Sequence, residues 1–421
     1  MAVMRLAFLM LMSSAALAAQ HSASRHVPAT PRRDSVAAMV IALATRVSPA
    51  VFGMVRSEVQ LTQPMLMFRG SKRAGAFRYA AMLNAERWTM PDGEPVAGIW
   101  GEGFIDRRHP HTVVHEVMLT GVRQVAGATL SLSAGKGIVP FGTDDPMVRP
   151  LAKYPANHHL SQVLERIQFV AAIRPGTHAA VEAAIFNGDE PAGPTAAPQW
   201  RRFGDSRAVR LSVWPRASIE LQGSGASVRS PEFASGEGLN QQKFSGSARF
   251  TPRRGAMRYA LLEWARTEER YRRRKIVGYG TALAEGVVAR GAVSIGGRLE
   301  QTSRPEEERL VDPFRTARPA NDLTIKGVTR WRLATIQASV GMPHAGSLHG
   351  ALFGEVTRAV STPLLSPVLL DPRDVIGSAS AWHVSLGARV GAGSMASRIG
   401  RYGAAAGGVG TDVPLAMGPH R

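Results

Sequence analysis

The chain has 421 residues, with 51 Lys and Arg against 32 Asp and Glu, 43 glycines, 27 prolines and no cysteine. This composition excludes a disulfide-stapled, a collagenous and a disordered chain, and a hydrophobic fraction of 44% is enough for a large core. Only six of the basic residues are lysines, so arginine carries the net charge of +19, which points to anionic partners.

Residues 1–19 predict a cleaved signal peptide. Arg5 precedes an apolar run, and Ala16 and Ala18 form an A-x-A cleavage pattern. The run is too short for a membrane-spanning helix, which needs about 20 apolar residues, and so is the next run, Val36–Ala44. Export excludes nucleic acid as a partner. We expect residues 20–54 to form an N-terminal periplasmic or lumenal segment.

Alternating apolar and polar residues predict strands further along the chain. In 381–390, Trp382, Val384 and Leu386 fall on one face, and Ser385 and Arg389 fall on the other. The same period recurs in 129–134, 166–174, 209–213, 244–250 and 293–300. A soluble β-sandwich also alternates. The small, arginine-bearing polar face favours a membrane barrel with a wet lumen.

Fifteen candidate strands have this character: 55–68, 76–85, 112–122, 127–137, 162–173, 179–187, 207–214, 217–228, 242–250, 256–266, 276–288, 292–303, 323–340, 349–360 and 381–391. The apolar face of 323–340 changes midway, which indicates a bulge or a missed turn. Bacterial barrels close with even strand numbers. We therefore predict an all-β fold, a closed antiparallel transmembrane β-barrel of about 16 strands (range about 14–18) over residues 55–391, with a C-terminal tail at 392–421.

The connections between these segments alternate between long and short. The long ones are rich in Pro, Gly and charge, and they fall at 86–111, 138–161, 188–206, 229–241, 304–322 and 361–380. Long external loops and short periplasmic turns are typical of outer-membrane barrels. Near the strand ends, Trp214, Trp264 and Trp382 are expected to belong to an interfacial aromatic girdle.

Several stretches of the chain resemble a little-characterised family of bacterial outer-membrane β-barrel proteins, distantly similar to phosphate-selective porins. They are GKGIVPFGTDDP at 135–146, KYPANHHLSQ at 153–162, GEGFIDRRHPH at 101–111, FNGDEP at 186–191, RPEE at 304–307 and DPFR at 312–315. The resemblance covers most of residues 80–390 and implies a barrel, with no established chemistry. The chain departs from the usual barrel ending, a terminal strand closing with Phe or Trp, because a Gly/Ala-rich tail follows Val390.

Histidines gather in two segments, and His-x-His-x-x-x-His spacing can offer imidazole nitrogens to a borderline cation. In a strand, however, His111 and His115 would lie about 13 Å apart, which favours a loop anchored by histidine hydrogen bonds. We expect no metal; the candidate ligands of the metal alternative are His109, His111, His115, His158 and His159. No cofactor is expected either, because Gly135-Lys136-Gly137 lacks the order of a phosphate-binding loop.

Arginines recur on the polar faces of the alternating segments, and they are the candidate pore-lining residues: Arg166, Arg174, Arg210, Arg249, Arg298 and Arg389. Glu220 and Glu300 are the clearest acids there. Rings of guanidinium groups would attract phosphate-like or carboxylate solutes. Alternatively, the arginines pair with loop acids folded into the lumen, such as Asp144, Asp145 and Glu306–Glu308, which would cancel the field.

A basic run, Arg270–Lys275, separates two candidate strands. It reads most simply as an exposed turn, and its functional alternative is contact with the phosphates of lipopolysaccharide or with an inner-leaflet surface.

Together these features predict a channel in the cell outer membrane for passive diffusion of small hydrophilic, anionic solutes. Its partners would be those solutes, outer-membrane lipids and lipopolysaccharide, and homo-oligomers remain open. No catalytic residue is expected and the chain is not predicted to be an enzyme. Two alternatives stay open: a metal-associated outer-membrane binding protein that uses its histidine loops, and an outer-membrane hydrolase, which would need a Ser–His pair.

Overall fold

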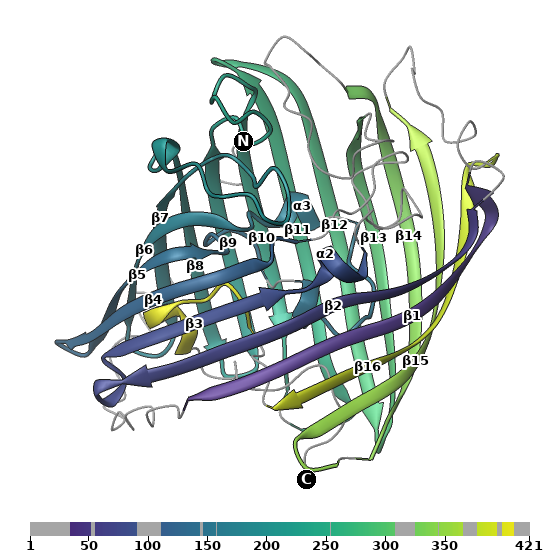
Figure 1. The fold of residues 1–421 in the computed structure, drawn as a ribbon, viewed down its shortest axis with the longest axis horizontal. Helices are drawn as coiled ribbons and strands as arrows, with labels where there is room; N and C mark the ends of the chain where they lie inside the picture. Colours follow the sequence, from purple (N-terminus) through teal and green to yellow (C-terminus); the bar gives the residue numbers. More distant parts are fainter. Residues whose placement is uncertain are drawn as a thin grey trace. The chain divides into compact units, whose positions relative to one another are not determined.

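The computed structural model describes residues 34–51, 55–90, 111–143, 146–156, 158–252, 254–307, 325–343, 345–364, 377–393 and 398–407. The predicted signal peptide therefore lies outside the described residues. Within these ranges sixteen strands form one closed barrel (Figure 1). Every strand pairs antiparallel with its neighbours along the chain, and β1 closes the ring on β16.

The first eight strands are β1 (Ser35–Val51), β2 (Val55–Lys72), β3 (Phe77–Asn84), β4 (Val114–Val125), β5 (Ala128–Gly137), β6 (Arg166–Pro175), β7 (Ala179–Phe186) and β8 (Ser206–Arg216). The second eight are β9 (Ile219–Val228), β10 (Asn240–Phe250), β11 (Met257–Tyr271), β12 (Arg274–Arg290), β13 (Val293–Glu307), β14 (Ile325–Gly341), β15 (Leu348–Pro363) and β16 (Ser380–Gly393).

The described helices are short: α2 (Glu86–Thr89), α3 (His158–Ser161), and the 3₁₀ turns η2 (Arg73–Gly75), η3 (Pro146–Val148), η4 (Trp200–Arg202) and η5 (Gly403–Gly407). In the described part of the chain, no helix is long and apolar enough to cross a bilayer.

The predicted closed antiparallel barrel of about sixteen strands is confirmed, but the strand missing from the fifteen candidates is β1. The barrel thus begins at Ser35. The prediction that residues 20–54 form a periplasmic or lumenal segment is therefore wrong for residues 35–51, which form β1. The inward side chains Met39, Ile41 and Leu43 are apolar because they pack in a core cluster with Met147. Both faces of β1 are therefore apolar over this stretch. The stretch lacks the alternation of apolar and polar residues that predicts the other strands.

No turn interrupts β14, so the prediction of a missed turn in 323–340 is wrong. The predicted bulge is confirmed, because the pairing with β13 shifts by one residue: Glu306 faces Gly327 and Glu307 faces Ile325. Lys326 is the extra residue of this bulge.

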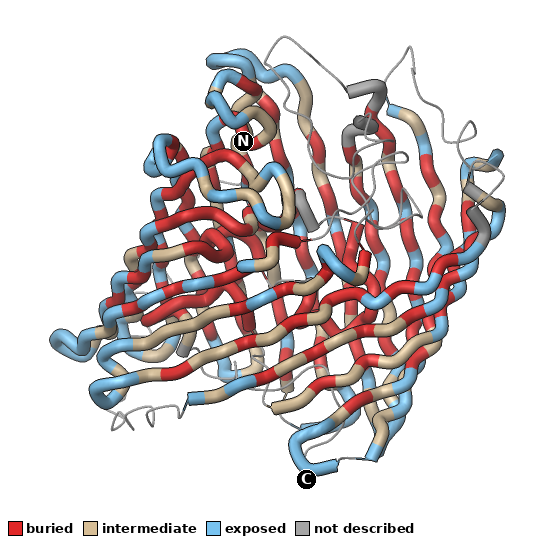
Figure 2. Tube along the Cα trace, in the orientation of Figure 1, coloured by how far each residue is buried: buried red, intermediate tan, exposed pale blue. Residues whose placement is uncertain are grey.

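Buried and exposed residues alternate along the strands, as the banding in Figure 2 shows. Outward positions carry exposed apolar residues, with Leu262, Leu299 and Leu386 at 62%, 64% and 68% exposed. The adjacent inward positions, such as Glu263 and Arg298, are buried. Because the side-chain period of a strand is two, one apolar and one polar face follow directly from the alternating sequence.

Turns at one end of the barrel are short, and the connections at the other end are mostly long. Between β4 and β5, Ala126 and Gly127 both have positive φ, as a two-residue hairpin of type I′ requires. The start of β1 and the end of β16 lie at this short-turn end, because the two strands pair from Ala37 opposite Gly393. The alternation of long and short connections agrees with the sequence prediction.

Candidate functional site in the barrel lumen

The inward face of the wall is charged. Of the six arginines predicted to line a pore, Arg166, Arg210, Arg249, Arg298 and Arg389 are buried on inward faces, between 1% and 5% exposed. Arg174 lies at the short-turn end of β6, half-buried, with its guanidinium 5.7 Å from the ring centre of Trp214. In this conformation the five buried arginines contact protein groups rather than bulk water.

Part of what they contact is the long connection between β5 and β6, residues 138–165. This segment carries apolar residues that are buried in the described structure, among them Ile138, Phe141, Met147 and Leu151. Leu151 packs in a cluster with wall residues of β11 and β12. Moving apolar side chains out of water lowers the free energy of the protein. A connection of this composition therefore folds into the barrel rather than outward.

Polar groups fix the same segment on the wall. Arg149 donates to Glu263 on β11 at 2.8 Å, and the Ala156 amide donates to Glu300 on β13 at 2.8 Å. Arg298 donates to the carbonyl of Lys153 at 3.0 Å, and Arg389 donates to that of Leu151 at 3.3 Å. The segment thus reaches wall strands on the far side of the ring from its own origin in β5.

Gly142 allows this segment to double back. Its φ is +75°, and a Cβ there would collide with the backbone carbonyl of Ser161. Only glycine combines this backbone conformation with such a close approach.

A second segment in the lumen comes from beyond the last strand. Residues 398–407, which include η5, lie inside the ring behind β3 and β4, drawn in yellow in Figure 1. The Ala404 amide donates to Ser131 on β5 at 2.8 Å, and the Tyr402 hydroxyl donates to Glu116 on β4 at 2.8 Å. The Tyr402 oxygen also accepts from the Ile138 amide at 3.0 Å, so the two inserted segments touch.

Two carboxylates on the wall hold this C-terminal segment. Glu220 on β9 accepts two hydrogen bonds from Arg398, at 2.8 and 2.9 Å, and a third from Arg401 at 3.1 Å. Glu182 on β7 lies 3.4 Å from Arg401 and accepts two hydrogen bonds from Arg210, at 2.6 and 2.7 Å. Paired guanidinium and carboxylate groups are among the stronger hydrogen-bonded contacts in proteins.

Trp214 belongs to this network and not to an outer girdle. It is 3% exposed, and its ring N–H donates to Glu220 at 2.8 Å, so the girdle expectation is wrong for this residue. Trp264 and Trp382 point outward, at 47% and 49% exposed.

Acids and bases nearly balance in the buried part of the structure. Among the described residues, thirteen Lys and Arg and twelve Asp and Glu side chains are buried. The wall acids that pair with arginine include Glu182, Glu263 and Glu285, none of which is among the residues predicted from the sequence. They lie at inward positions of alternating strands, as the arginines do. The same alternation of apolar and polar residues therefore predicts them as inward. The side chains of the loop acids proposed as partners, Asp144, Asp145 and Glu306–Glu308, lie outside the described residues.

Two of the candidate histidines, His111 and His115, are buried and bonded to buried carboxylates. His111 and Glu86 are 2.9 Å apart through Nδ1, and His115 and Glu165 are 2.7 Å apart. The ring centres of the two histidines are 5.0 Å apart, not about 13 Å, because β4 begins only at Val114. In the described part of the chain no three His, Cys, Asp or Glu side chains converge on a metal position. His109 and the side chains of His158 and His159 lie outside the description.

Inserted residues outside the strands have shifted pKa values. Burial alone would raise the pKa of Glu165, but the hydrogen bond with His115 and nearby positive charge hold that pKa well below its usual range. Burial lowers the pKa of Arg401 to about 9, and repulsion from Arg210 and Arg398 adds to it. Burial, together with the Glu116 carboxylate, raises the pKa of the Tyr402 hydroxyl.

Comparison with solved structures identifies the architecture. OprB of Pseudomonas putida superposes with a TM-score of 0.50 at 9% identity, covering 85% of this chain and 93% of that one. The fold is that of a bacterial outer-membrane porin.

An anion-selective porin from Comamonas acidovorans has a TM-score of 0.49 at 12% identity, covering 85% of this chain and 99% of that one. OmpT of Vibrio cholerae, in a trimer form, has a TM-score of 0.49 at 8% identity, covering 86% and 100%. No family model matches the chain, and no curated protein matches its sequence.

Proposed function

We propose that this chain is a porin-like channel of the outer membrane, through which small hydrophilic solutes diffuse passively. The observation that carries the proposal is a closed ring of sixteen strands with an apolar outer face and a charged inner face. Closure satisfies the backbone groups of every strand, which is required of a sheet in lipid. Barrels of about 16 strands are wide enough for an aqueous channel, in contrast to 8-stranded barrels filled by side chains.

Two inserted segments would narrow this channel. The connection 138–165 and the C-terminal residues 398–407 occupy the lumen from different sides, so the free cross-section is smaller than the ring alone implies. We therefore expect small solutes and low conductance.

Conductance of the purified, refolded protein in planar bilayers tests the proposal. Discrete, steady steps in salt solution are expected. A protein that inserts and stays silent would contradict the channel, and tight retention of a divalent metal in the same silent protein would favour the metal-binding alternative.

We further propose that the channel prefers anions, but weakly. The inward arginines support the direction of this preference, and the near balance of buried acids and bases supports its small size. In a salt gradient, the reversal potential should show a slight anion preference, and Glu182→Gln should increase it because the charge of Arg210 and Arg401 is then less compensated. A cation preference, or a reversal potential unchanged by Glu182→Gln, would contradict this part.

A further inference from the structure

A furrow of small residues runs along the outward face of β12. The even-numbered positions of this strand point out of the barrel and carry Gly278, Gly280, Ala282, Ala284 and Gly286. Eight residue steps at about 3.4 Å make the furrow about 27 Å long, close to the roughly 25 Å height of the apolar band of a membrane barrel.

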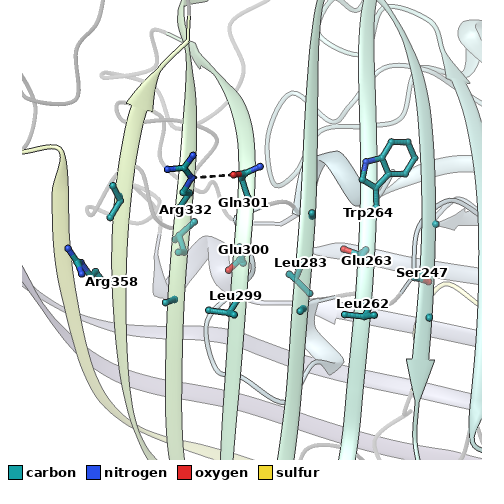
Figure 3. A pocket seen from close by; sticks show the side chains of 17 residues that line it. Ser247, Leu262, Glu263, Trp264, Leu283, Leu299, Glu300, Gln301, Arg332 and Arg358 are labelled. Atoms are coloured by element: carbon teal, nitrogen blue, oxygen red, sulfur yellow. Dashed lines mark hydrogen bonds between the residues drawn. The ribbon is translucent and has the colours of Figure 1, made fainter.

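Larger side chains on the neighbouring strands form its walls (Figure 3). The pairing register sets Ala282 between Trp264 of β11 and Gln301 of β13. One level further along, Ala284 lies between Leu262 and Leu299. Since adjacent strands are about 4.8 Å apart, the two walls stand about 10 Å from each other.

Two hollows that share the lining residues Leu262, Ala284 and Leu299 follow one another along β12 over residues 282–288. The one nearer the long connections has a volume of about 980 Å³ and the one below it about 800 Å³. On the first hollow, Arg332 donates to Gln301 at 3.2 Å and so stiffens one wall.

Cations gather where the furrow meets the turn between β11 and β12. A Cβ placed on Gly278 would lie 3.1 Å from Nζ of Lys275 and 3.6 Å from a terminal nitrogen of Arg266. Arg266, Arg270 and Lys275 lie 3.2, 3.4 and 3.3 Å from the single carboxylate of Glu268. Three cations sharing one acid leave a local excess of positive charge, and these cationic side chains are 36–44% exposed.

We propose that this furrow binds a phosphorylated lipid of the outer leaflet, the lipid A part of lipopolysaccharide, with an acyl chain along β12 and a phosphate at Arg266 and Lys275. An apolar furrow with an anion-binding end matches an amphiphile whose head is negative. The β11–β12 turn lies at the end of the barrel opposite Ser35 and Gly393, which is the outer leaflet if the short turns are periplasmic. This inference rests on the outer-membrane location in the proposed function.

The test measures binding of lipid A, and of lipid A with its phosphates removed, to the full chain folded in detergent, by native mass spectrometry. Arg266→Gln with Lys275→Gln removes the cations at the head of the furrow, and Ala282→Leu with Ala284→Leu fills it while keeping the surface apolar. We expect each pair to weaken lipid A binding roughly tenfold or more. Lipid A without phosphates should bind the wild type about as weakly as lipid A binds the charge variant.

Matched controls lie elsewhere on the outer face. Arg123→Gln removes an exposed outward arginine at the short-turn end of β4, and Ala134→Leu enlarges an exposed outward alanine on β5. Both should bind lipid A as the wild type does. Equal loss in the controls, or unchanged binding in both furrow variants, would overturn the proposal.

Oligomeric state and conductance distinguish a lipid site from a contact between copies and from the channel itself. If filling the furrow changes the oligomeric state and leaves lipid A binding intact, the furrow is a contact between copies and the proposal is wrong. Single-channel conductance should be unchanged in the furrow variants, because all four residues point away from the lumen. A wild type that binds lipid A through the furrow but does not conduct would support this inference and contradict the channel.

Discussion

At the scale of single residues, orientation decides what a substitution does. Leu386 is 68% exposed on the outward face of β16, and its neighbour Ser385 is 1% exposed and hydrogen-bonded to Thr45 at 2.8 Å. Two adjacent positions thus have different surroundings, the outside of the barrel for Leu386 and a packed polar lumen for Ser385.

Leu386→Arg should impair insertion. A guanidinium near the middle of the apolar band costs about 2–4 kcal/mol. The folded fraction after refolding into vesicles, read by the shift between heated and unheated protein in gel electrophoresis, should fall, whereas Leu386→Met should refold normally. Equal refolding of the two variants would mean that this strand has the opposite register.

Glu165 makes stability depend on pH. Its pKa is held below its unfolded value of about 4.3, so the ionised form is favoured in the folded protein and contributes stability above about pH 4.3. That contribution is lost as the pH falls further, through the folded pKa. The melting temperature in detergent should therefore drop more steeply below about pH 4.3 in the wild type than in Glu165→Gln. Parallel curves for the two proteins would contradict the assignment.

At the scale of elements, the two inserted segments differ in how they are attached. The connection 138–165 is tied to the wall at both ends by β5 and β6, whereas residues 398–407 follow the last strand and depend on side-chain contacts. Hydrogen bonds to charged groups contribute on the order of 1.5–3 kcal/mol each, so Arg398 and Arg401 account for much of what retains the C-terminal segment.

Arg398→Gln with Arg401→Gln should raise single-channel conductance, because the released segment no longer occupies the lumen. A chain ending at Gly393 keeps all sixteen strands and should show at least the same increase. Arg46→Gln, an exposed outward position on β1, serves as the matched control and should leave conductance unchanged. Wild-type conductance in the shortened chain would show that the segment does not obstruct the path.

At the scale of the whole molecule, closure depends on β1. This strand pairs with β16 on one side and β2 on the other, so its loss would leave two open sheet edges, which a sheet cannot keep in a lipid environment.

Ala42→Pro should prevent folding of the barrel. Proline removes a ladder hydrogen bond within a strand that is paired on both sides. Ala42→Val keeps the backbone donor and should fold, as judged by circular dichroism and resistance to protease in detergent. If Ala42→Pro folded with a normal β-spectrum, the ring would be closed by other strands.

The sequence by itself determined the fold class, fifteen strand positions, the inward face of each arginine row and the alternation of long and short connections. These features are local. Successive side chains of a strand point to opposite faces, so the order of apolar and polar residues shows directly which face each residue occupies. The same rule placed Arg210 and Arg298 inward without any knowledge of their partners.

Only the tertiary structure decided what fills the barrel. The sequence pattern did not predict β1, because its inward residues, such as Ile41, are apolar. They pack in one cluster with Met147, more than a hundred residues away. The pairing of Glu220 with Arg398 joins residues 178 positions apart. No local period reports such contacts, since they arise when a closed ring brings distant strands and the chain end into one interior. For that reason the sequence predicted a lumen rich in arginine but not the partners of those arginines. In the folded barrel they pair with buried acids and with backbone carbonyls of the inserted segments.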